Sequence, residues 1–440
     1  MTVGVQVLHL ALFEAGGSEH VAGAVGAVDL HAGYHVAKPA AVHRLTLAGL
    51  REFKTHDEIG LAVYFQFKPL LELTNFVHVE ILPDFLLSYS GLVNNRFRLI
   101  CQRGDSPLLL SGKKFLFPAF WPPEYLGHAN SLGVESPLLR IGNPSPEEEE
   151  EDPESFPDPT GESKVSPLPF LFRKYPDRVL ILLTSRCFFY CRFCFRRGNP
   201  PGESREVSQA GLRAIQDYVA KNGEIGEVIF SGGDPLTLGN TQLEEVLRLF
   251  ARVETVKRLR IHTRAPVVFP ERIDADLLAV LTRAGKPVEV VLHAVHPSEI
   301  RPSFEDALLK LRRADVALGN QTVLLKGVND RPEVLDELFY RLGELGVDTR
   351  YLHHTDRAPG NKRFRLTIPS GLAAHSRLSV ISRTEAPPYV IDLPDGSGKV
   401  PVSSLSPVAE ERAGALRRTR YRSPLPGLCG AGFEWWDIFG

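Results

Sequence analysis

The stretch RVLILLTSRCFFYCRFCFRR, residues 178–197, joins a short apolar run to three closely spaced cysteines. The run is rich in branched apolar residues, which predicts a buried β-strand over residues 178–184. Cys187, Cys191 and Cys194 then lie on the loop that leaves this strand. The same arrangement, a strand followed by a loop with chemically distinctive residues, recurs downstream and decides the fold.

Further strands are predicted at residues 227–233, 258–263, 288–294, 321–327, 349–355 and 388–394. Between them lie stretches with apolar residues at helical spacing, such as residues 243–253 and 331–345. Alternating strands and helices are typical of parallel βα units. Because the distinctive residues gather at the carboxyl ends of the strands, we expect an α/β fold with a partial (β/α)6-type barrel.

Changes in composition predict four regions. Residues 1–142 carry weak strand-like alternation and have an uncertain fold, and the acidic, proline-rich residues 143–165 are expected to be a solvated linker that binds nothing. Residues 166–402 hold the βα units and the distinctive residues. Residues 403–440 are a C-terminal tail, whose aromatic end GFEWWDIFG is expected to dock onto a neighbouring surface, in the same chain or in another.

The charge balance excludes some classes of partner. The 440 residues include 51 basic and 53 acidic side chains, so no strong field favours nucleic acid or an anionic membrane. No apolar run reaches the length of a membrane span, and the opening residues lack the pattern of a secretory signal. The sequence therefore predicts a soluble, cytoplasmic protein.

The three clustered cysteines predict a metal centre. Five cysteines, with Cys101 and Cys429 isolated, do not resemble a disulfide framework. The pattern C-x3-C-x2-C lacks the fourth ligand of a structural zinc site, and a redox C-x-x-C pair would leave one thiol unexplained. Three thiolates can instead hold three irons of a [4Fe–4S] cluster, which leaves the fourth iron open.

An ordered set of motifs resembles a known family, the radical S-adenosylmethionine (SAM) enzymes, and within it lysine 2,3-aminomutase and its relatives, including the enzyme that prepares β-lysine for elongation factor P. The resemblance covers about residues 158 to 401. It rests on DPTGESKVSPLP, YPDRVL, YCRFCFRR, SGGDPL, HTRAPVV, HAVHPSEI, LGNQTVLLKGVND and DLPDGSGKVPV, in that order.

The resemblance implies a radical mechanism that uses S-adenosylmethionine. The open iron would chelate the amino and carboxylate groups of this molecule, and one electron from an external donor would release a 5′-deoxyadenosyl radical. Gly232, Gly233 and Asp234 match positions that receive the methionyl amino group, and His293 matches an active-site histidine of the family. Glycines suit such a place because the backbone can approach a ligand closely.

The resemblance also implies pyridoxal 5′-phosphate, whose π system takes up an unpaired electron. Lys399, in a glycine-rich loop, matches the lysine that holds this cofactor. Tyr175, Arg178 and Gln321 match positions near the cofactor phosphate. Lys174 stands where relatives often have arginine.

The implied substrate is a small dibasic amino acid, L-lysine, converted to β-lysine. Arg196 matches the residue that binds the substrate carboxylate, and arginine suits this bidentate anion. Asp356 and Asp392 match the pair that holds the distal ammonium, which needs paired charges when it is buried.

Some features depart from the family pattern, and alternatives remain open. Arg331 stands where zinc-containing relatives have a cysteine, and only Cys429 lies near the end, so we expect no structural zinc. A homo-oligomer is possible. One alternative is the same radical chemistry on a different amino acid. Another is an iron–sulfur electron carrier or sensor without enzymatic activity.

Overall fold

The computed structural model describes residues 30–32, 43–55, 58–67, 76–80, 117–198, 206–413, 416–426 and 432–439. Cys101 and Cys429 lie outside these residues. The chain divides into two compact units, Met1–Ser106 and Pro107–Gly440. This boundary differs from the predicted one at residue 142, because two short helices before that point pack into the second unit.

The first unit contains an antiparallel sheet. Its strands are β1 (Leu30–Ala32), β2 (His43–Thr55), β3 (Glu58–Phe67) and β4 (Phe76–Glu80), and they pair in sequence order. The weak alternation that we noted in the N-terminal sequence falls in β3 and β4.

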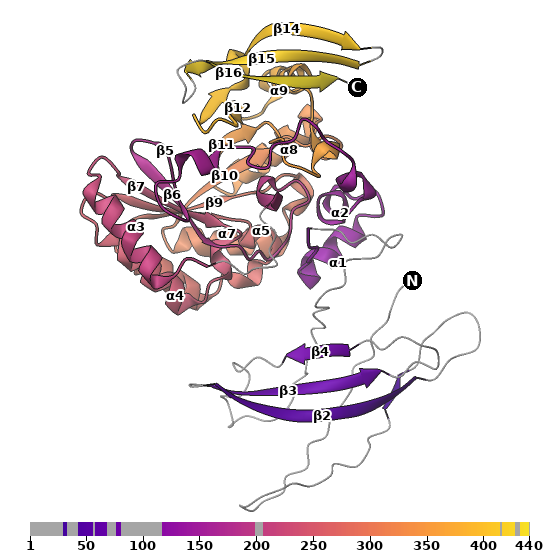
Figure 1. Ribbon diagram of the computed structural model, residues 1–440, viewed down its shortest axis with the longest axis vertical. Helices are drawn as coiled ribbons and strands as arrows, with labels where there is room; N and C mark the ends of the chain where they lie inside the picture. Colours follow the sequence, from indigo (N-terminus) through magenta and orange to yellow (C-terminus); the bar gives the residue numbers. More distant parts are fainter. Residues whose placement is uncertain are drawn as a thin grey trace, which may run out of the picture. The chain divides into compact units, whose positions relative to one another are not determined.

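The second unit is built on a curled, nine-stranded sheet, the partial barrel that the sequence predicts (Figure 1). Strands β6 to β12 run parallel to their neighbours, and β5 and β13 close the two edges in antiparallel pairing. The order along the sheet is that of the sequence, in reverse. The strands are β5 (Leu171–Tyr175), β6 (Arg178–Thr184), β7 (Glu227–Gly232), β8 (Arg258–Thr263), β9 (Val288–Leu292), β10 (Ala317–Val323), β11 (Asp348–His353), β12 (Tyr389–Asp392) and β13 (Lys399–Pro401).

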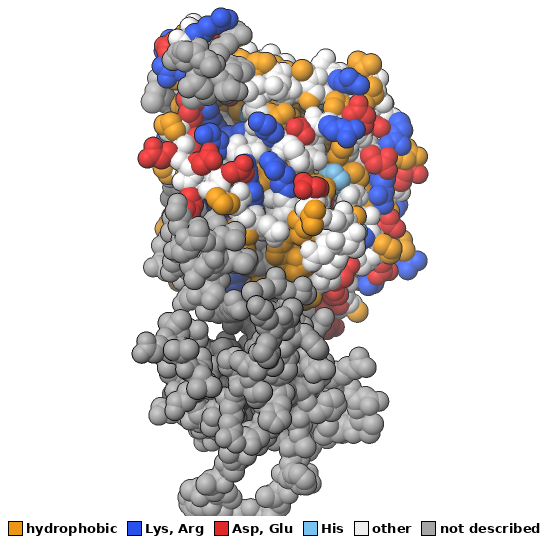
Figure 2. Space-filling model, turned by 90° about the vertical axis from the view of Figure 1, so that its right-hand side faces the viewer, with side chains coloured by type: hydrophobic (Ala, Val, Ile, Leu, Met, Phe, Trp, Pro, Cys, Tyr) orange, Lys and Arg blue, Asp and Glu red, His pale blue; other side chains and the backbone are white. Residues whose placement is uncertain are grey.

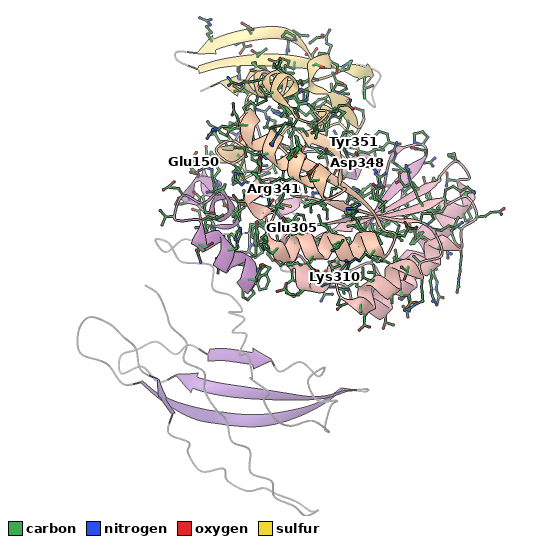
Figure 3. The ribbon with its side chains drawn as sticks, turned by 180° about the vertical axis from the view of Figure 1, so that it is seen from behind. Glu150, Glu305, Lys310, Arg341, Asp348 and Tyr351 are labelled. Atoms are coloured by element: carbon green, nitrogen blue, oxygen red, sulfur yellow. The ribbon has the colours of Figure 1, made fainter. Side chains whose placement is uncertain are left out.

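Helices cover the outer face of this sheet, and most residues of the central strands are buried, including charged residues such as Arg260 and Glu289. All five residues of β9 are buried, as expected of a parallel strand covered on both sides. Neighbouring helices are also tied together: Arg341 of α8 lies beside Glu305 of α7, with 3.4 Å between nitrogen and oxygen (Figure 3). The helices are α3 (Gln209–Lys221), α4 (Asn240–Ala251), α5 (Ala265–Val268), α6 (Ala275–Thr282), α7 (Pro302–Arg313), α8 (Pro332–Glu344) and α9 (Ile368–Ile381).

Two helices from the predicted N-terminal region belong to the same core. They are α1 (Pro123–Ser131) and α2 (Pro137–Gly142). Tyr125 of α1 and Ile141 of α2 are fully buried, and the Ile141 carbonyl accepts a 2.8 Å hydrogen bond from the Arg192 backbone N–H. These helices therefore pack directly against the loop that carries the cysteines.

The acidic segment corrects one expectation, because it is not a solvated linker that binds nothing. Its side chain Glu148, on the short helix η2 (Pro146–Glu149), is only 2% exposed. It forms ion pairs with Arg192, Arg197 and Arg363. Like charges repel along an isolated run, but here arginines from distant loops neutralise the carboxylate, so the segment is folded onto the second unit.

The predicted C-terminal tail forms an antiparallel sheet of β14 (Ser406–Ala413), β15 (Leu416–Pro426) and β16 (Gly432–Phe439). The aromatic end docks in the same chain. Trp435 is 5% exposed and belongs to the hydrophobic core, and the Asp437 carboxylate accepts a 2.8 Å hydrogen bond from the Ile368 backbone N–H at the start of α9.

The surface agrees with the balanced charge of the sequence on the face that Figure 2 shows, where acidic and basic side chains are interleaved. Within the described part of the chain, no helix has the length and apolar character needed to cross a membrane.

Candidate active site

A cavity of about 1180 Å³ lies inside the half-barrel and extends to the cysteine loop. Every predicted site residue lines it, although these residues come from widely separated parts of the chain. They are Tyr175, Arg178, Cys187, Cys191, Cys194, Arg196, Gly232, Gly233, Asp234, His293, Gln321, Asp356, Asp392 and Lys399.

The three thiols are partly buried on the loop after β6. Burial raises the pKa of all three, and that of Cys191 to about 11, although Arg264 acts in the opposite direction on Cys191. Within the described residues, no three His, Cys, Asp or Glu side chains converge closely enough to hold a single metal ion. The three thiols line one cavity, and in a [4Fe–4S] cluster each cysteine binds a different iron.

The glycines after β7 allow two loops to touch. The Gly233 N–H donates a 2.6 Å hydrogen bond to the Thr184 carbonyl, and the Asp234 N–H donates one of the same length to the Arg186 carbonyl. A Cβ at position 233 would collide with the Arg186 backbone, and Gly232 has φ of 133°. Glycine is therefore required here for the contact between backbones.

Asp234 itself is held by protein donors. Its carboxylate accepts hydrogen bonds from the Leu236 N–H at 3.0 Å, the Thr263 hydroxyl at 2.6 Å and the Arg264 N–H at 2.9 Å. Burial raises its pKa, against the effect of these donors. The side chain thus fixes the loop after β7 to the end of β8.

Two histidines and a glutamine form a neutral cluster in the middle of the cavity. The Gln321 amide lies 3.0 Å from His293 Nε2 and 3.4 Å from His262 Nδ1. Burial lowers the pKa of His293 to about 3, so the ring is neutral. Gln321 thus contacts the histidines, and its predicted role near a phosphate stays a prediction.

Lys399 lies in an ion network at the edge of the sheet. It pairs with Asp392 across β12 and β13, and its Nζ is 3.3 Å from the Asp392 carboxylate. Lys174 approaches the same carboxylate at 3.4 Å, and His353 does so at 3.6 Å. The Tyr175 hydroxyl accepts a 3.0 Å hydrogen bond from the Lys399 backbone N–H. Several elements therefore fix the position of this lysine.

The two predicted carboxylates have opposite electrostatic character. Burial alone would raise the pKa of Asp392, but Lys399, His353 and Lys174 hold it well below its usual value. Burial raises the pKa of Asp356 to about 8, and the nearby Asp392 acts in the same direction. Asp356 is therefore largely protonated at neutral pH.

Arg196 already binds a carboxylate. Its guanidinium forms a two-point contact with Glu162, in which Nε donates at 3.0 Å and Nη2 donates to the second oxygen. Both side chains line the cavity. This geometry is the fork that arginine presents to any carboxylate, including that of an amino acid.

A group of arginines lines the cavity near the starts of the strands. The Arg178 guanidinium lies 4.9 Å from the ring of Tyr175. Arg258, Arg260 and Arg350 line the same cavity, with buried Glu227 and Glu289 between them. Such a group suits a phosphate.

Sequence reasoning did not assign roles to several residues that the fold brings to the site. Glu162 lies in a motif that we quoted, and Arg264 lies in another, but neither motif shows which distant side chain it meets. The sequence suggested Lys174 only as a contact to the cofactor phosphate, whereas its side chain also lies beside Asp392.

Comparison with known proteins identifies the class of this site. Residues 181–339 match the family model described as the Radical SAM superfamily. The L-lysine 2,3-aminomutase of Escherichia coli (strain K12) is 36% identical over 261 residues, which are 59% of this chain and 76% of that protein. The L-lysine 2,3-aminomutase of Methanococcus maripaludis is 37% identical over 246 residues, 56% of this chain and 57% of that protein.

A related protein with a different substrate in its name is similar to the same extent. The glutamate 2,3-aminomutase of Clostridioides difficile (strain 630) is 34% identical over 281 residues, 64% of this chain and 66% of that protein. The fold and the match of residues 181–339 define a radical SAM protein. More narrowly, the chain belongs to the lysine 2,3-aminomutase family.

Proposed function

We propose that this protein is a radical SAM, pyridoxal phosphate-dependent aminomutase that interconverts L-lysine and β-lysine. The observation that carries the proposal is that one cavity joins the thiols, Lys399, Arg196 and the aspartate pair. An iron–sulfur carrier or sensor needs the thiols but not the other groups.

In this proposal, Cys187, Cys191 and Cys194 hold a [4Fe–4S] cluster and leave one iron for S-adenosylmethionine. When bound, these two groups supply a radical that removes a hydrogen atom from the substrate. The loop at Gly232 and Gly233 lies against the cysteine loop, so backbone groups there are well placed to bind the methionyl end. Because the carboxylate of Asp234 is held by protein donors, its main role in this proposal is to fix that loop.

Lys399 would hold pyridoxal phosphate, which supplies a π system that accepts the unpaired electron. The residues fit this group. Lys399 faces the cavity, its backbone is fixed by Tyr175, and Arg178 stacks on that ring beside the other arginines, which would bind the phosphate.

Arg196 would bind the substrate carboxylate by exchanging Glu162 for it, and Asp356 with Asp392 would hold the distal ammonium. The protein's contribution to the radical steps is then to position the reacting carbon and to keep water away. Phe189 and Phe193 line the cavity next to the cysteines and serve the second purpose.

The test is anaerobic incubation of the reconstituted protein with S-adenosylmethionine, a reductant and L-lysine, with β-lysine measured by mass spectrometry. We expect β-lysine from the wild type and none from Cys191→Ala. Parallel incubation with L-glutamate tests the related substrate. Deoxyadenosine without β-lysine would keep the radical class but refute lysine as the substrate.

A spectroscopic experiment separates the aminomutase from an electron carrier. Protein loaded with pyridoxal phosphate is expected to show visible absorbance from the lysine-bound cofactor, and Lys399→Ala is expected to lose it. Wild-type protein without this absorbance would favour the carrier. An external electron donor, a cytoplasmic location and a possible homo-oligomer complete the proposal.

A further inference from the structure

A buried arginine contacts one of the cluster cysteines. Arg264 directly follows β8 and is 7% exposed. Its Nη1 donates to Cys191 Sγ at 3.4 Å. The guanidinium also lies 5.1 Å from the ring of Phe189 and 5.7 Å from that of Phe193, both on the cysteine loop. The guanidinium is therefore packed against the loop that carries the thiols.

A buried carboxylate neutralises this arginine on its other side. Glu299 is fully buried and accepts a hydrogen bond from Arg264 Nη2. The Tyr125 hydroxyl donates to Glu299 at 2.6 Å, and the backbone N–H of Val295 does so at 2.6 Å. Donors from three parts of the fold therefore fix the Glu299 carboxylate. As a result the Arg264 guanidinium is held between the Cys191 thiol and this carboxylate.

This order has a consequence for any iron–sulfur cluster bound to Cys191. Reduction adds negative charge to the cluster, and the potential depends on net charge, on hydrogen bonds to sulfur and on exposure to solvent. A donor and positive charge at the sulfur favour the reduced cluster and raise the potential. A carboxylate behind the donor opposes this effect, and a dry interior strengthens both.

We propose that the Arg264–Glu299 pair sets the reduction potential of the cluster, with Arg264 raising it and Glu299 lowering it. This inference rests on the proposed function only in requiring a cluster at the three cysteines. In this proposal both are positioning residues that act through Cys191. The reduction potential matters because the cluster must take one electron from a donor and pass it to S-adenosylmethionine.

The test is a redox titration of the reconstituted full chain, followed by electron paramagnetic resonance of the reduced cluster. At the midpoint potential of the wild type, Arg264→Gln is expected to lower the ratio of reduced to oxidised cluster about tenfold, which is about 59 mV for one electron. Glu299→Gln is expected to raise the ratio by a similar factor. Arg264→Lys keeps the positive charge but not the two-point hydrogen bonding of a guanidinium, so its midpoint potential is expected to lie between those of Arg264→Gln and the wild type.

Arg301 provides a matched control. It is also a buried arginine, 5% exposed, and it pairs with Glu124 and lies 5.2 Å from the ring of Tyr125. Arg301→Gln is expected to destabilise the fold as Arg264→Gln does, but to leave the potential unchanged. A purely structural role would make the two variants alike in both properties.

The outcomes separate this inference from the proposed function. Equal potentials in all variants, or shifts of the same sign for Arg264→Gln and Glu299→Gln, would refute the inference while leaving the aminomutase proposal intact. A wild type that assembles no cluster would refute both. If Arg264→Gln does not fold, Glu299→Gln decides alone, because only a raised potential agrees with the proposal.

Discussion

Replacing Glu148 by alanine is expected to destabilise the second unit strongly. The carboxylate is 2% exposed and pairs with fully buried Arg192, which lies between two of the cysteines, and with Arg197 and Arg363. Removing one partner of a buried ion pair costs about 3–5 kcal/mol, because the other charge stays behind without compensation.

We expect the loss of stability in Glu148→Ala to lie within that range rather than above it, because two of the arginines keep other hydrogen-bond acceptors. Arg192 Nη1 keeps its hydrogen bond to the Pro118 carbonyl at 2.6 Å, and Arg197 Nη1 keeps one to the Gly360 carbonyl at 2.9 Å. Glu148→Gln retains an acceptor oxygen and is expected to cost about half as much. Because these acceptors remain, we do not expect the costs of losing the ion pairs with the three arginines to add.

Tryptophan fluorescence during urea unfolding measures this loss, because all three tryptophans, Trp121, Trp435 and Trp436, lie in the second unit. The control is Glu151→Ala, an exposed residue of the same acidic run, which is expected to stay within about 0.5 kcal/mol of the wild type. A Glu148→Ala protein as stable as Glu151→Ala would refute the reasoning.

The effect also has a definite pH dependence. Burial raises the pKa of Glu148, but the arginines lower it more, so the net pKa lies below the ordinary value of 4.5. A carboxyl with a lowered pKa stabilises the fold above its unfolded value and loses this contribution as pH falls through the folded value. The difference between the wild type and Glu148→Ala is therefore expected to shrink below about pH 4.

Three further predictions concern the cavity. Gly233→Ala is expected to cost about 1–3 kcal/mol and to lower iron content, because its Cβ meets backbone, whereas Gly239→Ala, with open space around its Cβ, is expected to change neither. Because the pKa of Asp356 is about 8, kcat/KM for lysine is expected to rise about tenfold from pH 7 to 9, and a flat profile would contradict this. Asp356→Asn is expected to abolish the rise. Arg196→Lys, which loses the two-point fork, is expected to raise KM for lysine about tenfold or more, and an unchanged KM would remove Arg196 from carboxylate binding.

Most parallel strands were predictable because they are short runs with several apolar or β-branched residues between helical stretches, although β8 and β11 also carry charged side chains. The edge strands β5 and β13 were not predicted, and among the predicted strands the largest error lies at β10, predicted at residues 321–327 and found at Ala317–Val323. Gly319 and Asn320 are poor strand formers, yet the Asn320 amide is fully buried, accepts a hydrogen bond from the Ala294 N–H at 2.8 Å and donates to Thr322. Tertiary packing therefore overrides local preference at this strand.

The C-terminal sheet carried a signal that we did not use. Along β15, Arg418, Arg420 and Arg422 alternate with buried Thr419 and Tyr421, which is the period of two of a strand with one covered face. The high density of arginine hides this pattern when only hydrophobic runs are considered.

The acidic segment shows a different limit of sequence reasoning. A run of glutamates predicts solvation when it is read alone, and nothing local distinguishes Glu148 from its exposed neighbour Glu151. The difference arises from Arg192, which is distant in sequence and pairs with Glu148. The same limit applies to the hydrogen bond between Arg196 and Glu162 and to the one between Arg264 and Cys191, because each joins residues that are far apart in the sequence.

The charges of the ligand-free cavity bear on the choice between lysine and glutamate. Glu162 pairs with Arg196, and Lys399 and Lys174 both lie beside Asp392, so these two predicted substrate-binding groups already have partners of opposite charge from the chain. Because the pKa of Asp356 is raised, a nearby cation would favour its ionised form at neutral pH. Lysine brings one net positive charge and supplies that cation, whereas glutamate brings a net negative charge and would leave Asp356 protonated. The charges of the ligand-free cavity therefore agree with the proposed dibasic substrate.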